Sequence, residues 1–378
     1  MKRLVCFHLF NDFSGSPKVL RMVLGGLLER GELSDERGEL RVECGELRVD
    51  VVTSKGEGAL SDLDGRKGVR MHRYAYRFSE RAAVTMVRYI GVQLYLFFFA
   101  LRYAFSKDTT FYVNTILPVG AALAGRLTGK RVVYHYHEDA VTKGAFYLFL
   151  SRAMQVLASE IICVSAYQRS FLQRKEHVQV VPNAVPATFV ARLQPDPMAA
   201  FDRQRVLLLG SLKRYKGTLE FVELARRVPE YPFELVLNET PENIAAFWKE
   251  NGIRLPENLT VHPRQQDVVP FYNRATVVLN LSNKYEFVET FGMTVLEALS
   301  AGLPVIVPTV GGVAELVEDG INGWKIDVEN LDAIEAKLRA LLHDRTLYCQ
   351  LAEQALNTAQ RFSEESMLKQ IKTVIDPK

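Results

Sequence analysis

The chain has 378 residues, of which 48% are hydrophobic and 24% charged, a composition that supports a large buried core and excludes a disordered protein. Lysine and arginine total 47 against 44 acidic residues, and this net charge of +3 is too small for the concentrated basic surface that binds nucleic acid. At roughly 150 residues per domain, the length favours two or three domains.

Cysteine usage and the start of the chain give expectations about the compartment. No CxxC pair occurs among the four widely spaced cysteines, Cys6, Cys44, Cys163 and Cys349. This spacing argues against a disulfide framework and a zinc site, and it favours a reducing cytoplasm. The apolar run that follows Met1 is short and contains His8, so no export signal is expected.

The N-terminal half alternates between strand and helix patterns. It opens with a strand pattern over residues 4–10, a turn over 11–17 and a helix pattern over 18–30. Further strands are predicted at 110–113, 131–137, 160–164 and 178–181. Such alternation predicts a parallel sheet with helices on both faces.

A Gly-Glu-Leu unit occurs three times at a spacing of seven residues, starting at Gly31, Gly38 and Gly45. The glycines oppose a coiled coil, and the last copy runs into the alternating segment 47–51. We therefore predict the second strand at 47–51 and a duplicated insertion in a surface loop before it.

One apolar segment, residues 89–101, invites comparison with a membrane span. It has only thirteen residues, whereas crossing a bilayer takes about 20. The favoured interpretation is a helix buried in or between domains. The alternative is peripheral contact by an interfacial helix resting on a membrane, with Arg88, Arg102 and Lys107 near anionic lipid.

An irregular, proline-marked passage interrupts the alternation at 182–197, and the pattern restarts at residue 205. The predicted fold class is α/β, with two Rossmann-like doubly wound parallel-sheet domains facing a cleft. The predicted parts are an N-terminal Rossmann-like domain 1–185, a linker 186–204, a C-terminal Rossmann-like domain 205–355 and a C-terminal helix 356–378 that packs back on the first domain.

Two glutamates spaced by eight residues, Glu289 and Glu297, flank the glycine at position 292. If a helix begins near Gly292, the backbone N–H groups of Phe291 and Met293 are among its unpaired donors, which suit a diphosphate. Eight helical residues span about 12 Å, so two carboxylates can flank a diphosphate and accept hydrogen bonds from hydroxyls on either side. Either glutamate considered alone is best explained as an ordinary charged residue at or near a helix. The two together, followed by the glycine-spaced strand, favour a binding site.

The sequence from Glu289 onward resembles the retaining glycosyltransferases of family 4, which have the GT-B fold. The resemblance is carried by the E-x7-E spacing followed by EALSAGLPVIVPTVGGVAELVEDGINGW at 297–324. Supporting matches are GSLKRYKG at 210–217, Val164-Ser165 after a strand, and PNAV at 182–185. The resemblance covers nearly the whole chain and is closer after Val178.

This resemblance implies roles for residues of the C-terminal half. Glu289 would contact hydroxyls of the donor sugar, Glu297 the ribose, and Lys216 the phosphates, where it neutralises leaving-group charge without a metal. The backbone at Phe291, Gly292 and Met293 would hold the diphosphate. Gly210 and Ser211 would contribute to donor binding, although the family often has arginine where this chain has Ser211, and Lys213 or Arg214 could substitute.

In the N-terminal half, Gly15 and Ser16 resemble the family's glycine loop that approaches the donor; an ordinary turn is the competing interpretation. His135 and His137 lie on the same face of the predicted strand, a spacing that fits a metal, but no third ligand is identifiable and none is expected. The family has a histidine near the reacting sugar at the position of His137, where it would act as a neutral hydrogen-bond partner or orient the acceptor.

The implied catalytic residues are therefore Glu289, His137 and Lys216, with no metal and no cofactor beyond the nucleotide sugar as co-substrate. The expected reaction is transfer of a hexose from a UDP- or GDP-sugar to a hydroxyl of a glycan or lipid-linked acceptor, in surface polysaccharide synthesis in the cytoplasm. Two alternatives stay open: a nucleotide-sugar epimerase of the same architecture, and a noncatalytic protein that binds sugar nucleotides.

Overall fold

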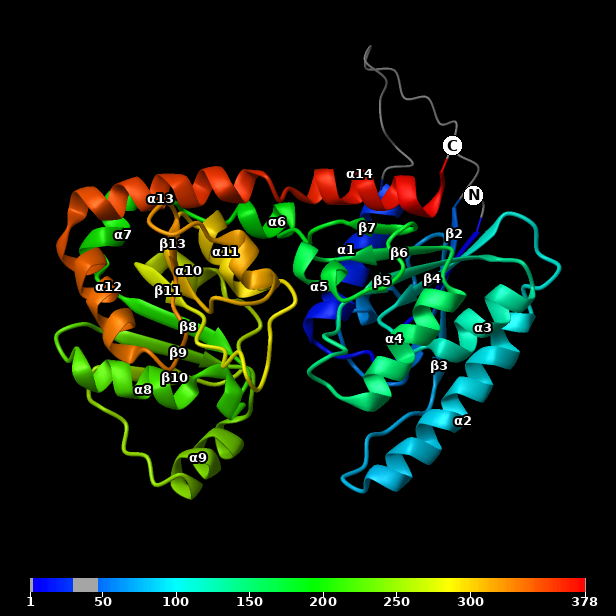
Figure 1. Ribbon diagram of the computed structural model, residues 1–378, viewed down its shortest axis with the longest axis horizontal. Coiled ribbons are helices and arrows are strands. Elements are labelled where there is room, and N and C mark those ends of the chain that lie inside the picture. Colours follow the sequence, from blue (N-terminus) through cyan, green and yellow to red (C-terminus); the bar gives the residue numbers. More distant parts are fainter. Residues whose placement is uncertain (1–2, 30–46, 378) are drawn as a thin grey trace, which may run out of the picture. The chain divides into compact units, whose positions relative to one another are not determined.

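The computed structural model describes residues 3–29 and 47–377, which divide into two compact units. The first unit comprises Met1–Pro182 together with Glu365–Lys378, and the second is Asn183–Glu364. Figure 1 shows that each is built around its own sheet. The copies of the Gly-Glu-Leu unit that start at Gly31, Gly38 and Gly45 fall wholly or mostly outside the described residues.

In its described residues, the first unit has a seven-stranded sheet in the order β3-β2-β1-β4-β5-β6-β7, and all neighbouring strands are parallel. The strands are β1 (Arg3–Phe7), β2 (Arg48–Ser54), β3 (Val69–Tyr74), β4 (Thr109–Asn114), β5 (Arg131–Tyr136), β6 (Glu160–Cys163) and β7 (Val178–Val180). All six residues of β4 are buried, as expected for a central strand covered on both faces.

The helices of this unit are α1 (Gly15–Glu29), α2 (Ala82–Leu101), α3 (Val119–Leu127), α4 (Ala145–Leu157), α5 (Ala166–Ser170) and α14 (Glu364–Ile375), with a short 3₁₀ helix, η2, at Ser61–Leu63. Helix α3 packs against both α2 and α4 (Figure 1). The C-terminal helix α14 crosses α1 at Gly26, where a Cβ atom would lie 2.2 Å from Leu368. Arg131 also donates a hydrogen bond from Nη2 to the carbonyl of Val374 (2.9 Å), which ties α14 to the first sheet.

The second unit repeats the topology with six strands among its residues, in the order β10-β9-β8-β11-β12-β13, again all parallel. They are β8 (Val206–Gly210), β9 (Phe233–Leu237), β10 (Leu259–His262), β11 (Val277–Leu279), β12 (Val305–Val307) and β13 (Gly323–Lys325).

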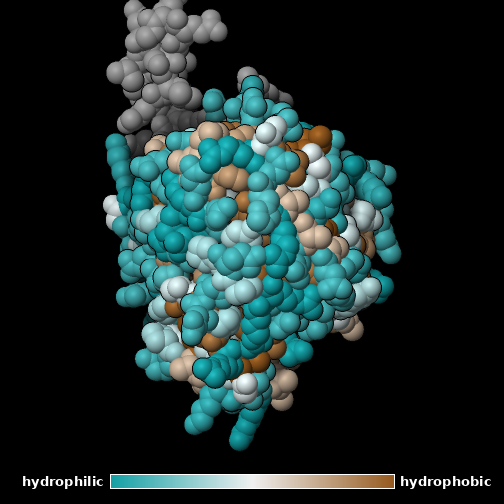
Figure 2. Space-filling model, turned by 90° about the vertical axis from the view of Figure 1, so that its left-hand side faces the viewer, coloured by the Kyte–Doolittle hydropathy of each residue, from teal (hydrophilic) through white to brown (hydrophobic). Residues whose placement is uncertain are grey.

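Its helices are α6 (Ala187–Val190), α7 (Pro197–Arg203), α8 (Thr218–Arg227), α9 (Pro241–Glu250), α10 (Val269–Arg274), α11 (Met293–Ser300), α12 (Leu331–His343) and α13 (Arg345–Gln360), with 3₁₀ helices η3 (Arg214–Lys216) and η4 (Gly312–Leu316). The predicted linker 186–204 thus contains α6 and α7. The side of the molecule seen in Figure 2 is mainly hydrophilic, with apolar residues scattered over it.

The two parallel sheets confirm the predicted α/β class. The sequence prediction did not include β3 or β13: β3 alternates polar and apolar residues at a sheet edge, and β13 has only three residues. The apolar segment predicted at 89–101 is longer than expected, because α2 begins at Ala82 and has 20 residues.

In each sheet the strand order reverses direction at one place, between β1 and β4 in the first unit and between β8 and β11 in the second. The loops that leave such neighbouring strands run to opposite faces of the sheet and leave a crevice at the carboxyl ends, which is where open parallel sheets bind ligands.

Candidate functional site

The loop that follows β8 carries Lys216 to the carboxyl end of the second sheet. This loop forms the 3₁₀ helix η3 and ends at Gly217, which has φ +73° and precedes α8. A Cβ atom at Gly217 would lie 2.3 Å from both the Cβ and the carbonyl oxygen of Leu281. Only glycine therefore allows the loop to pack directly against the segment that follows β11.

That close approach brings Lys216 onto Glu289. The Nζ of Lys216 lies 2.5 Å from Oε1 of Glu289, and the two side chains are 16% and 20% exposed. The hydroxyl of Ser282 donates to the same carboxylate oxygen at 3.4 Å. The ammonium group also lies 3.8 Å from the ring centroid of Phe287, which stacks on Tyr215. The pair is thus held in one place while remaining accessible to solvent.

Two adjacent glycines of the 297–324 motif, Gly311 and Gly312, position the backbone of Glu289. The N–H of Gly312 donates to the carbonyl of Glu289 at 2.8 Å. Gly311 has φ +110°, and a Cβ atom there would lie 2.6 Å from the same carbonyl oxygen. A side chain at Gly311 would therefore displace the segment that carries the carboxylate.

Gly292 is the N-cap of α11, as the sequence indicates, with φ +97° and no room for a Cβ atom, which would lie 2.6 Å from Val313. Phe291 is buried and Met293 is half-buried at the first helical position. The first turn of α11 therefore offers its backbone N–H groups beside Glu289, in the arrangement that suits an anion.

Glu297, in the second turn of α11, has a buried partner that the sequence analysis did not identify. Its Oε2 accepts a hydrogen bond from the hydroxyl of Tyr272 at 2.6 Å. Burial, and secondarily the nearby Glu297 carboxylate, raise the pKa of Tyr272, so this hydroxyl remains a donor. Tyr272 is in α10, and nothing in the sequence signals that its hydroxyl orients a glutamate 25 residues later.

The remaining donor-side residues also lie at this edge. Gly210 ends β8 and Ser211 follows it half-buried, whereas Lys213 and Arg214 are exposed. Arg264, which follows β10, donates from Nε to Oδ1 of Asn238 (2.7 Å), which follows β9.

In the first unit, Gly15 and Ser16 occupy the first turn of α1 rather than a preceding turn, because the helix begins three residues earlier than predicted. A Cβ atom at Gly15 would meet no atom within 4 Å, so the fold itself does not require glycine there.

Asn114, the last residue of β4, joins this helix start to the predicted histidine. Its Nδ2 donates to the carbonyl of Ser16 (3.1 Å), which orients the amide so that Oδ1 faces Nε2 of His137 (3.0 Å). His137 therefore carries its proton on Nε2, and Nδ1 is the acceptor nitrogen. The sequence analysis missed Asn114, although its place at the end of a central strand was a usable signal.

Two further histidines surround this group. His8 lies within 3.0 Å of the Asn114 amide nitrogen, and the ring of His135 lies 4.1 Å from that of His137. Burial lowers the pKa of His8 to about 4 and that of His135 to about 3. Burial, then the neighbouring histidines, hold the pKa of His137 well below its ordinary value. All three imidazoles are thus neutral at pH 7.

Within residues 3–29 and 47–377, no group of three His, Cys, Asp or Glu side chains is placed to hold a metal ion. The sequence contains one Asp-x-Asp motif, Asp62-Leu63-Asp64, a pattern that can bind a metal. Both carboxylates face arginines instead: Asp62 pairs with Arg21 (2.5 Å) and Asp64 with Arg73 (3.0 Å).

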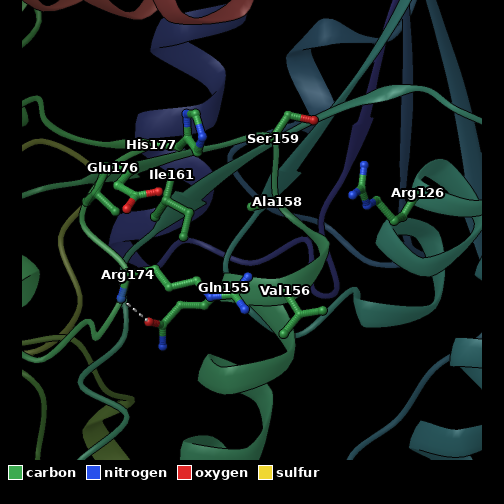
Figure 3. A pocket seen from close by; sticks show the side chains of 10 residues that line it. Arg126, Gln155, Val156, Ala158, Ser159, Ile161, Arg174, Glu176 and His177 are labelled. Atoms are coloured by element: carbon green, nitrogen blue, oxygen red, sulfur yellow. Dashed lines mark hydrogen bonds between the residues drawn. The ribbon is translucent and has the colours of Figure 1, made fainter.

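A depression of about 490 Å³ lies elsewhere on the first unit, where Ser159 and His177 precede β6 and β7. Figure 3 shows Gln155 at its wall, accepting a hydrogen bond from the backbone N–H of Arg174 (3.1 Å). The depression is at the amino ends of the strands, opposite to the edge that holds Asn114 and His137, and is therefore separate from the candidate site.

Comparisons with known proteins bear on this arrangement. Residues 196–358 match the family model described as "Glycosyl transferases group 1". An uncharacterized glycosyltransferase from Haemophilus influenzae is 22% identical over 277 residues, covering 71% of this chain and 76% of the relative. The N-acetyl-alpha-D-glucosaminyl L-malate synthase of Bacillus anthracis is 24% identical over 46% of this chain and 45% of its own length.

Among solved structures, Anabaena HepE in complex with UDP and glucose superposes with a TM-score of 0.76 at 18% identity, covering all of both chains. This likeness extends the match from the second unit to the fold of the whole chain. The second unit thus matches the glycosyl transferases of group 1 over residues 196–358, and the whole chain has the fold of the GT-B glycosyltransferases.

Proposed function

We propose that this glycosyltransferase moves a hexose from a UDP- or GDP-sugar to a hydroxyl group of a glycan or lipid-linked acceptor, with retention of the anomeric configuration. The observation that carries the proposal is the Lys216 and Glu289 pair beside the N-terminus of α11. One cation, one carboxylate and a row of backbone N–H groups meet at the carboxyl edge of the sheet, as a sugar diphosphate requires.

Donor binding would exchange partners within this group. The diphosphate would take Lys216 and the α11 N–H groups, and Glu289 would accept hydrogen bonds from sugar hydroxyls instead of from the ammonium. As the bond between the anomeric carbon and the phosphate oxygen breaks, negative charge grows on the diphosphate, where Lys216 and α11 stabilise it. Glu289 would hold the ring so that the acceptor attacks from the leaving-group side.

Glu297 and His137 complete the proposed machinery. The hydrogen bond from the Tyr272 hydroxyl fixes the orientation of the Glu297 carboxylate, which would then accept hydrogen bonds from two ribose hydroxyls. His137, which is neutral and oriented by Asn114, would be a hydrogen-bond partner of a sugar or acceptor hydroxyl. Because Lys216 and backbone groups supply the positive charge, we propose a metal-independent reaction. The wide spacing of the cysteines favours a cytoplasmic enzyme.

The test begins with calorimetric binding of UDP-, GDP- and ADP-sugars to the full chain, followed by turnover with the tightest binder and a panel of glycan and lipid-linked acceptors. The Anabaena structure with UDP and glucose makes UDP-glucose the first donor to test. Glu289→Ala should abolish transfer and spare nucleotide binding, whereas Glu297→Ala should weaken nucleotide affinity. The exposed Glu286→Ala is the matched control.

Three outcomes would contradict the proposal. Near-normal turnover by both glutamate variants would remove the assigned roles. A new sugar nucleotide formed without any acceptor would favour the epimerase, and binding without turnover would favour a noncatalytic protein.

A further inference from the structure

Helix α2 has two apolar faces, and only one of them is covered. Tyr89, Val92, Leu96, Phe99 and Ala100 are buried in the core of the first unit. A second row is exposed to solvent: Val87 (70%), Ile90 (51%), Leu94 (55%) and Phe98 (65%). Their spacing of three and four residues places these side chains on one stripe. A helix on the surface of a globular protein ordinarily has polar residues there.

Exposed apolar residues also occur on the two neighbouring helices, α3, which packs against α2, and α4, which packs against α3 (Figure 1). Leu127 on α3 is 68% exposed, and Phe149 and Val156 on α4 are 64% and 58% exposed. The ring of Phe146 contacts Tyr89 (5.4 Å between centroids), which joins α4 to α2 directly. We call the exposed apolar residues of these three helices the α2–α4 surface.

The charges around this surface are predominantly positive. Within residues 75–157, which are described throughout, the exposed basic residues are Arg77, Arg81, Arg88, Arg102, Lys107, Arg126, Lys143 and Arg152, whereas the exposed acidic residues are Glu80 and Asp108. Two of the arginines, Arg81 and Arg102, are the two caps of α2. The chain as a whole is nearly neutral, so this local excess is a property of the surface.

We propose that the α2–α4 surface binds an anionic lipid bilayer, with the apolar stripe of α2 inserted among the acyl chains and the flanking arginines against lipid phosphates. Apolar side chains rimmed by cations are the features by which a helix lies in the plane of a membrane interface. A hydrophilic protein partner would not offset the exposure of a stripe this apolar.

The same helix is long and apolar enough to cross a membrane by length and composition. Its inner face, however, forms part of the core through Leu96 and Phe99, and spanning would expose that core. Binding in the plane of the interface keeps the fold intact. This corrects the length argument made from the sequence, where only thirteen apolar residues were recognised; burial of one face, not shortness, opposes a span.

This inference rests on the proposed function, because membrane binding would bring the enzyme to a lipid-linked acceptor. Membrane binding itself does not require catalysis. The test is co-sedimentation of the full chain with vesicles of phosphatidylcholine alone and with 30% phosphatidylglycerol, a composition chosen as the probe. Anionic vesicles should bind the chain, and raising the salt concentration should weaken binding.

The variants Leu94→Ser and Phe98→Ser should each reduce vesicle partitioning by about tenfold, because each removes an apolar side chain that inserts. Arg81→Glu with Arg102→Glu should abolish the preference for anionic vesicles and leave the apolar stripe unchanged. Ile321→Ser, at an exposed apolar residue of the second unit, is the matched control. Glu289→Ala should bind as the wild type does, which separates this inference from the proposed chemistry.

Equal binding by the wild type and the stripe variants would overturn the proposal, as would no binding to anionic vesicles. Dimerisation of the chain that Phe98→Ser abolishes would assign the surface to a second copy. Resistance to carbonate extraction would assign α2 to a membrane span.

Discussion

The two sheets share one topology, yet the crevices at their carboxyl ends have opposite chemistry. In the second unit a charged pair, Lys216 and Glu289, lies beside the N-terminus of α11. In the first unit the corresponding place holds neutral groups: Asn114 with the buried imidazoles of His8 and His135 and the half-buried imidazole of His137. The fold therefore provides the location of a site and leaves its chemistry to the residues at the strand ends.

The difference follows from how each crevice is packed. Glycines with positive φ, such as Gly217, draw the loops of the second unit together without burying the charges completely. In the first unit His135 is in β5, and His8 and His137 directly follow the ends of β1 and β5, where desolvation disfavours the charged imidazole. One crevice can stabilise developing charge, and the other can fix the position of hydroxyl groups.

The largest expected effect comes from removing the charge of the second crevice. Lys216→Ala should lower kcat/KM by roughly 10²–10³-fold, because one preorganised group that stabilises the leaving diphosphate is lost. Steady-state kinetics with the donor identified in the binding screen measures this loss. Lys249→Ala, at an exposed lysine of α9, is the control. A similar loss of kcat/KM in both variants would show that Lys216 has no specific role in stabilising the leaving diphosphate.

A smaller loss is expected in the first crevice. Asn114→Ala should lower kcat by roughly 10–10²-fold, because His137 loses the acceptor that orients its ring. Asn114→Asp keeps an acceptor but adds a carboxylate, which should raise the pKa of His137. Activity of this variant should then fall as the pH drops through that raised pKa, whereas the wild type should show no such step. Identical pH profiles would show that Asn114 has only a structural role.

Acidification should destabilise the first unit more than the second. The pKa values of His8 and His135 in the folded chain, about 4 and about 3, lie below the value of about 6.5 for an unfolded chain. The unfolded state therefore binds more protons, and stability present above about pH 6.5 is lost as the pH falls. Between pH 7.5 and 5, each buried histidine should cost about 2 kcal/mol.

The two tryptophans, Trp248 and Trp324, both lie in the second unit and report on it alone. Urea unfolding followed by far-UV circular dichroism and by tryptophan fluorescence should therefore separate at pH 5, with the dichroism transition moving to lower urea. Equal shifts of both signals would contradict the assignment of the acid-sensitive group to the first unit.

The smallest effects should distinguish the glycines of the two crevices. Gly217→Ala should cost roughly 1–3 kcal/mol of stability, because its φ of +73° and its contact with Leu281 leave no room for a methyl group. Gly15→Ala should change stability by less than about 0.5 kcal/mol, since its surroundings are open, and should raise the KM for the donor if a ligand approaches there. Thermal unfolding measures the loss of stability in Gly217→Ala. An unchanged KM for the donor in Gly15→Ala would show that Gly15 does not contact the donor.

Local patterns were sufficient to predict most strands and the helix start at Gly292, because strand periodicity and glycine placement act over a few residues. The edge strand β3 was missed because its alternation covers only six residues and is broken by two adjacent polar residues, His72 and Arg73. The hydrogen bonds from Tyr272 to Glu297 and from Asn114 to Ser16 were also missed, because their partners are 25 and 98 residues apart.

The sequence by itself determined the α/β class, the glycine-bounded helix at 293 and the acidic pair around it, since each depends on neighbouring residues. Only the tertiary structure decided that Lys216 meets Glu289, that three histidines are neutral, and that one face of α2 is left uncovered. The physical reason is that ion pairing, desolvation and exposure depend on which distant segments come into contact, and residue order does not encode those contacts in any local pattern.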